Sequence, residues 1–364
     1  MRNKTACVVA HFSRTLLGLV FLFSGSVKAI DPLGTTYKIE DYLKAFGGFF
    51  TDLIPLAGTA AFVLIAVEFV LGICLVMNIK PQFTSWLTLA FYLVMTPLTL
   101  YIALTNPVSD CGCFGDAVIL TNWQTFWKNV VLLTLSVLWL CTKKDAPGRW
   151  VWQVELSVSM LGAAAVVCFM LWTLRHLPVV DFRPYKVGND LPALMEYPED
   201  AEPDQYEVTL VYEKDGQEQT FTLENYPKGD STWTFVSQQS MLIKKGYEPP
   251  IHDFDILNTE EENITYDLLE SEEPVTLIVM YDLRKTDKKA LEPLRLLPEE
   301  NTYYVTGSGT DDILAFCLEY PQFDAERFCT CDPVTLKTIV RANPGIVVIK
   351  NGVVQRKLNA RDLP

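Results

Sequence analysis

Five long apolar runs occupy the first half of the chain, and no comparable run follows them. A helix that crosses about 30 Å of hydrocarbon needs roughly 17–25 mainly apolar residues. The runs lie at about Cys7–Ala29, Ile54–Met77, Phe83–Leu104, Gln124–Cys141 and Val151–Leu174. The pattern therefore predicts five transmembrane helices, with the two ends of the chain on opposite sides of a membrane.

After the last run the pattern becomes short and irregular. Residues 177–205 contain five prolines among acidic residues, which predicts an extended or irregular tether. Apolar and polar residues then alternate in Tyr206–Tyr212 and Glu218–Leu223, and the intervening Asp215-Gly216 is a strong turn signal. We therefore predict a β-hairpin after the tether.

From Val275 onward, strand-like and helix-like segments alternate, which is typical of an α/β domain with a mixed sheet. The predicted strands are Val275–Tyr281, Thr302–Thr306, Arg327–Cys331, Ile346–Ile349 and Val353–Lys357, and the predicted helices are Asp287–Leu297, Asp311–Tyr320 and Pro333–Arg341. We expect four regions: a four-helix membrane domain (1–145), a fifth helix (146–176), the tether (177–205) and a soluble domain (206–364).

Charge separates the same two halves. Residues 1–180 have a net charge of +3, whereas residues 181–364 have a net charge of −17. Basic residues of the short loops set orientation. They cluster before the first run, between the second and third, and between the fourth and fifth, at Arg2, Lys4, Lys80, Lys143, Lys144 and Arg149. We therefore expect a cytoplasmic N-terminus and an acidic domain on the other side.

Two Cys-x-Cys pairs fall on the side assigned to the soluble domain, where disulfides persist. In the first, Cys111 and Cys113 flank Gly112, which relaxes the backbone restriction. Cysteines two apart can be bridged, but so small a ring stabilises little and is easily reduced. We therefore weigh redox exchange against a structural disulfide. Two thiolates fall short of the usual four metal ligands, so no metal site is predicted.

The second pair, Cys329 and Cys331, precedes a predicted helix with Asp332 as its N-cap and Pro333 as its first residue. A helix N-terminus favours a thiolate at Cys331, whereas the carboxylate of Asp332 disfavours one. We treat this pair as a second redox candidate, with a structural role as the alternative.

Ionisable side chains within apolar runs are functional candidates. Arg14, Lys28 and Glu68 are of this kind, and Glu68 lies near the middle of its run. We expect Glu68 to pair with Arg14 or His11 as a contact that organises the bundle, with proton or quinone handling as the alternative.

The membrane half resembles a known family at particular residues. "SRTLLGLVFLFSGSVKAIDP" (Ser13–Pro32) and "AVEFVLGICLVM" (Ala66–Met77) are similar to the first two helices of DoxX-like membrane proteins. "DCGCFGD" (Asp110–Asp116) is similar to a loop of MauE, the methylamine-utilisation protein of the same wider group. The resemblance implies a bacterial inner-membrane protein with a role in disulfide formation or maturation of a periplasmic protein.

The soluble half resembles a periplasmic thioredoxin-like domain. "GYEPPIHDFDI" (Gly246–Ile256) looks like that family's entry segment, and "NPGIVVIKNGVVQRKL" (Asn343–Leu358) looks like its closing hairpin, which makes Pro344 a candidate cis-proline. Where the family places Cys-x-x-Cys, this chain has Asp282–Thr286 without cysteine. The resemblance therefore implies the fold without the usual dithiol.

Two function classes remain open. One is a membrane thiol–disulfide oxidoreductase that acts through Cys111 and Cys113 on an extracytoplasmic thiol or disulfide protein. The other is a non-enzymatic assembly protein, whose redox-inactive domain binds a partner. The lipid bilayer is the expected environment, and nothing indicates nucleic acid. No cofactor is identified, and the sequence does not support a quinone.

Overall fold

A computed structural model describes residues 4–108, 111–148, 150–198, 200–203, 205–214, 216–244 and 246–363, without the side chains of 145, 242 and 244. Five of the described helices are long and apolar enough to cross a membrane, as predicted. They are α1 (Lys4–Ile30), α3 (Ala57–Met77, continuing the 3₁₀ segment η1, Gly48–Leu56), α4 (Pro81–Thr105), α5 (Asn122–Thr142) and α6 (Trp152–Arg175). The basic residues Arg2 and Arg149 lie outside the described residues.

Helices α1 and α3 pack closely through small residues. A Cβ atom on Gly25 would lie 2.8 Å from the backbone nitrogen of Phe69, and one on Gly72 would lie 2.6 Å from that of Leu22. Such backbone approach requires glycine. The antiparallel register thus places Lys28, one turn beyond Gly25, near Glu68.

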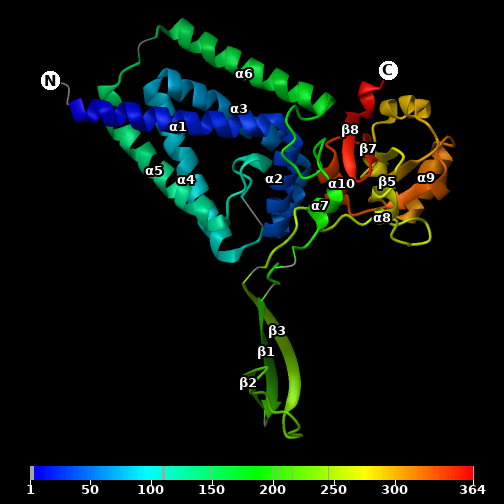
Figure 1. Ribbon diagram of the computed structural model, residues 1–364. Helices are drawn as coiled ribbons and strands as arrows, with labels where there is room; N and C mark the ends of the chain where they lie inside the picture. Colours follow the sequence, from blue (N-terminus) through cyan, green and yellow to red (C-terminus); the bar gives the residue numbers. More distant parts are fainter. Residues whose placement is uncertain are drawn as a thin grey trace.

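A helix that the sequence analysis did not predict, α2 (Pro32–Phe46), follows α1 directly. The Asp31 carboxylate caps it by accepting from the Gly34 N–H at 2.9 Å, and Pro32 occupies its first position. Figure 1 shows α2 at the end of the bundle that faces the soluble domain, opposite the N-terminus.

The soluble domain is built on a five-stranded mixed sheet of order β6-β5-β4-β7-β8. Its strands are β4 (Val275–Val279), β5 (Thr302–Thr306), β6 (Phe328–Thr330), β7 (Gly345–Lys350) and β8 (Val353–Asn359). Strands β4, β5 and β6 run parallel, and β7 and β8 are antiparallel. The predicted α/β domain is therefore confirmed.

In the described residues from Thr265 onward, short α-helices and 3₁₀ turns accompany the sheet. The helices are α8 (Thr265–Leu269), α9 (Thr310–Glu319) and α10 (Pro333–Ile339). The 3₁₀ turns of the described residues beyond η1 are η2 (Gly115–Ala117), η3 (Lys143–Asp145), η4 (Leu283–Lys285), η5 (Lys288–Ala290), η6 (Glu292–Leu296), η7 (Ala325–Arg327) and η8 (Ala360–Asp362). The helix predicted at Asp287–Leu297 was wrong: η5 and η6 replace it, and Pro293 lacks the N–H that would continue a helix.

A separate sheet of order β2-β1-β3 projects from the body of the molecule (Figure 1). Strands β1 (Gln205–Lys214) and β2 (Gln217–Thr222) form the predicted hairpin, whereas β3 (Thr234–Lys244) was not predicted. Asp215 of its turn lies outside the described residues.

The segment expected to be an extended tether is partly packed against the five-stranded sheet. Its short helix α7 (Leu191–Met195) buries Leu191, and the Gly188 N–H donates to the Val354 carbonyl at 2.8 Å. Part of the expected tether therefore belongs to the soluble domain.

Candidate functional site

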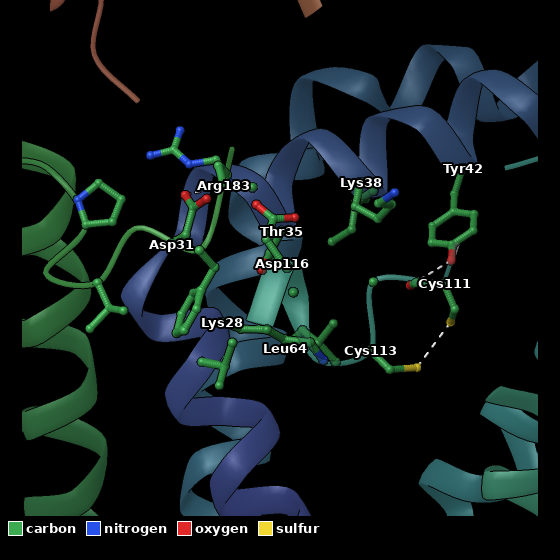
Figure 2. A pocket seen from close by; sticks show the side chains of 18 of the residues that line it. Lys28, Asp31, Thr35, Lys38, Tyr42, Leu64, Cys111, Cys113, Asp116 and Arg183 are labelled. Carbon is green, nitrogen blue, oxygen red and sulfur yellow. Dashed lines mark hydrogen bonds between the residues drawn. The ribbon is translucent and has the colours of Figure 1, made fainter. Parts of the chain in front are cut away.

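The first Cys-x-Cys pair lies in the loop between α4 and α5. The Sγ atoms of Cys111 and Cys113 are 3.1 Å apart, which is within hydrogen-bonding distance (Figure 2). Neither cysteine forms a disulfide. Gly112 between them has a φ of +62°, a conformation that glycine adopts at low cost. The bend at Gly112 thus brings the two sulfurs together.

Two helices hold the backbone of this loop. The Tyr42 hydroxyl of α2 donates to the Cys111 carbonyl at 2.8 Å (Figure 2), and the Ser24 hydroxyl of α1 lies 2.8 Å from the Cys113 carbonyl. Cys111 is buried and Cys113 is half-buried. Sequence reasoning did not find Tyr42 or Ser24, because neither is close to the pair along the chain.

The loop favours ionisation of one thiol of the pair. The hydrogen bond from Cys111 lowers the pKa of Cys113, and the ammonium groups of Lys128 and Lys28 lower it further against the effect of burial. The same hydrogen bond and burial raise the pKa of Cys111. These effects favour ionisation at Cys113 rather than at Cys111.

Cys111 and Cys113 are among the residues that line a cavity of about 180 Å³. Its walls are mainly apolar. Figure 2 shows Lys28, Asp31, Lys38 and Asp116 among the charged side chains that line it. The linker after α6 closes one side through Phe182 and Arg183. The pair thus lies where the membrane helices, α2 and the linker of the soluble domain meet.

The predicted partner of Glu68 was wrong. The Nζ atom of Lys28 lies 2.8 and 2.9 Å from the two carboxylate oxygens of Glu68, and both side chains are buried. Arg14 instead donates to the carbonyls of Leu75 and Val76 of α3, the latter at 2.7 Å. The α1–α3 register explains this, because it sets Arg14 beside the end of α3 and Lys28 beside its middle.

An ion-pair cluster joins the soluble domain to this loop. Arg341, which follows α10, contacts Asp31 at 2.8 Å and Asp116 at 3.3 Å, and its side chain is only 8% exposed. The hydroxyl groups of Tyr37 and Tyr281 lie 3.2 Å apart nearby. These contacts place the soluble domain and the Cys111–Cys113 loop on the same side of the bundle.

The second pair has a different environment. Cys329 and Cys331 flank the end of β6 and belong to the core of the soluble domain, at 3% and 8% exposed. Burial raises the pKa of Cys329 to about 11, and burial with Asp332 raises that of Cys331 to about 12. Asp332 and Pro333 start α10 as predicted, but the pKa of the Cys331 thiol is raised rather than lowered.

The Asn343–Pro344 peptide bond is cis, as predicted. The Asn343 side chain donates to the Asp282 carbonyl at 2.8 Å, which holds the cysteine-free Asp282–Thr286 segment beside Pro344. In the described part of the chain, no group of three or more His, Cys, Asp or Glu side chains could hold a metal ion.

These features define a multi-pass membrane protein with an α/β domain attached at one end of its bundle. Residues 6–142 match the family model of methylamine utilisation protein MauE, in agreement with the resemblance of the membrane half. Residues 206–245, which form the projecting three-stranded sheet, match a domain of unknown function, DUF8463. No curated protein and no solved structure matches the chain.

Proposed function

We propose that the protein carries out thiol–disulfide exchange through Cys111 and Cys113, with a thiol- or disulfide-bearing protein as its partner. The observation that carries this proposal is the 3.1 Å contact between two free sulfurs. The pKa of one of them, the Cys113 thiol, is lowered, which favours its thiolate form. Thiolates, rather than thiols, are the nucleophiles of exchange.

The exchange begins when the Cys113 thiolate attacks a disulfide of the partner. The partner's S–S bond breaks, a mixed disulfide with Cys113 forms, and the leaving sulfur takes up a proton. Cys111 then loses its proton to solvent and attacks the Cys113 sulfur. The mixed disulfide breaks as the Cys111–Cys113 disulfide forms, and the second partner sulfur leaves and takes up a proton from solvent. Two electrons have passed to the partner, which leaves as a dithiol. The reverse sequence oxidises a partner dithiol.

This exchange belongs on the periplasmic side of a bacterial inner membrane. The distribution of Lys and Arg supports that orientation, and disulfides persist in that compartment. A periplasm-active reporter fused after Val180 is expected to be active, and one fused after Lys144 inactive. The opposite pattern would place the pair in a reducing compartment and end the proposal.

Trapping of the mixed disulfide tests the exchange itself. Cys111→Ser removes the resolving thiol, so covalent partner adducts on Cys113 should accumulate and be released by reductant. The double variant Cys111→Ser/Cys113→Ser should give none. Cys168→Ser, at an exposed position of α6, is the control and should trap nothing. Full cellular activity of the double variant, with no adduct from either single variant, would contradict the proposal.

A second candidate function is that of a non-enzymatic assembly protein whose soluble domain binds a partner without redox chemistry. The buried, protonated thiols of Cys329 and Cys331 and the cysteine-free Asp282–Thr286 segment favour it. Three parallel strands followed by an antiparallel hairpin support a thioredoxin-like assignment of this domain. A double variant that keeps activity would favour this second function.

A further inference from the structure

An apolar groove opens on the membrane bundle at the end opposite the soluble domain. Helix α4 packs mainly against α5, whereas α3 packs mainly against α1, so α3 and α4 diverge beyond the short turn that joins them. A groove of about 660 Å³ lies between them, and α6 contributes a further wall. This groove is distinct from the cavity beside the cysteine pair, because no described residue lines both.

The walls of the groove match the hydrocarbon of a membrane. Among the residues that line it are Val70 and Leu71 of α3, Phe83 and Leu87 of α4, and Ala163 of α6. Phe83 is 64% exposed, so the protein itself does not cover this surface. An empty apolar groove forfeits dispersion contacts along its walls. Because all three helices are long and apolar enough to cross a membrane, a lipid acyl chain is the apolar group available to fill the groove.

Two opposite charges lie at one end of the groove. Lys80, in the turn between α3 and α4, lines the groove and is exposed. The Glu155 carboxylate of α6 accepts from the Lys80 backbone N–H at 3.1 Å, and Glu155 is 9% exposed. Among the described residues, no basic side chain forms an ion pair with this carboxylate. A buried ionisable group in a membrane helix is costly to maintain and is a functional candidate by default.

The charged end of the groove lies at the level of lipid headgroups. Trp86, in the second turn of α4, and Trp152, at the start of α6, are 55% and 62% exposed. Exposed tryptophans are enriched at the interface between membrane and water. Lys80 has a φ of +42°, which is uncommon for a residue with a side chain, and backbone of this kind clusters at ligand clamps. A lipid headgroup at this end therefore meets Lys80 while its acyl chain extends into the groove.

We propose that this groove binds one molecule of phosphatidylethanolamine. An acyl chain lies in the groove, the Lys80 ammonium contacts the lipid phosphate, and the Glu155 carboxylate contacts the ethanolamine ammonium. This headgroup carries one charge of each sign, as the site does, whereas phosphatidylglycerol carries a phosphate and no ammonium. The lipid site depends neither on the cysteine pair nor on the proposed exchange.

Native mass spectrometry of the full-length protein in detergent, with equal amounts of phosphatidylethanolamine and phosphatidylglycerol of the same acyl chains, tests the headgroup. The wild type should retain one lipid, mainly phosphatidylethanolamine. Lys80→Gln removes the phosphate contact and should weaken retention of both lipids about fivefold. Glu155→Gln should weaken retention of phosphatidylethanolamine by about the same factor without weakening that of phosphatidylglycerol. Lys144→Gln, an exposed position at the same end that does not line the groove, should change neither.

A steric variant tests whether the acyl chain lies in the groove. Ala163→Phe fills part of the groove, and displacement of even two methylene groups should weaken retention of either lipid about tenfold. Ala164→Phe adds the same ring at the next position of α6, which is exposed and does not line the groove, and should retain lipid as the wild type does. The headgroup competition on the wild type needs no variant, so it decides the case if Ala163→Phe fails to fold.

Equal lipid retention by Ala163→Phe and Ala164→Phe would show that the lipid only surrounds the bundle, and would overturn the inference. A wild-type protein without bound lipid would do the same. So would a lipid-free dimer, because a second copy of the chain would then cover the groove. Preference for phosphatidylglycerol, or retention of phosphatidylethanolamine that Glu155→Gln leaves unchanged, would overturn the assignment of the headgroup.

Discussion

The two Cys-x-Cys pairs have the same spacing but opposite environments. Cys111 and Cys113 lie in a bent loop at the end of the bundle, with ammonium groups nearby and a cavity alongside. Cys329 and Cys331 flank the end of a strand whose residues rise about 3.3 Å each, inside the core of the soluble domain. The spacing alone therefore does not distinguish the two pairs; the bend and the nearby charges do.

Thiol reactivity is the largest difference that we expect between the pairs. At pH 8 the lowered pKa of Cys113 leaves a large thiolate fraction, whereas a pKa of about 11 leaves Cys329 almost entirely protonated. Together with burial, this should make alkylation of Cys113 by iodoacetamide about a hundredfold faster. Peptide mass spectrometry of the reduced protein gives both rates. Comparable rates would show that the pairs are chemically alike.

Arg341 connects the region that holds one pair with the region that holds the other. Arg341→Gln leaves Asp31 without its buried partner, and breaking a buried ion pair costs about 3–5 kcal/mol. Hydrogen exchange of α2 and alkylation of Cys113 should both rise, while Cys329 stays protected. Arg284→Gln, which breaks an exposed pair with Asp312, should cost at most about 1 kcal/mol and change neither. Unchanged exchange in α2 would mean that Arg341 does not hold the two regions together.

A structural role for the second pair predicts a stability effect rather than a chemical one. Cys329→Ser buries a hydroxyl in an apolar core and should destabilise the soluble domain by about 1–3 kcal/mol. Cys113→Ser should leave that domain unchanged. Pulse proteolysis of the full-length protein in detergent measures both. If Cys329→Ser left the stability of the soluble domain unchanged and slowed exchange with the partner, the redox role would belong to this second pair instead.

Sequence periodicity found the elements whose pattern is local. The five apolar helices and the β1–β2 hairpin follow from hydrophobic runs and turn residues. Helix α2 was missed because Lys38, Glu40, Asp41 and Lys44 break its apolar pattern, and packing at the end of the bundle stabilises it instead. Strand β3 was missed because it is rich in Ser and Gln.

The candidate site was predictable only in part, for a related reason. The Cys-Gly-Cys motif is visible along the chain, but its partners are distant in sequence. Arg341 and Asp31 are 310 residues apart, and the choice of Lys28 rather than Arg14 for Glu68 depends on the register of two helices. Contacts of this kind are set by tertiary packing, which local pattern does not specify.

The smallest effect that we expect concerns the bend that distinguishes the first pair. Gly112 has a φ of +62°, and a Cβ atom there would lie 2.9 Å from the Lys38 Cγ atom. Alanine costs roughly 1–2 kcal/mol in this conformation, and Lys38 must also move. The backbone at residue 112 should relax away from the positive φ and from Lys38, which opens the bend and separates the two sulfurs. Closure of the Cys111–Cys113 disulfide by oxidised glutathione should slow about five- to thirtyfold.

Gly229 provides a matched control for this last variant. Its φ is +84° and nothing lies within 4 Å of a Cβ atom there, so Gly229→Ala carries the backbone cost alone, far from the pair. Its closure rate should equal that of the wild type. If Gly112→Ala also closes at the wild-type rate, the bend does not bring the sulfurs together, and the charges around Cys113 must account for the difference between the pairs.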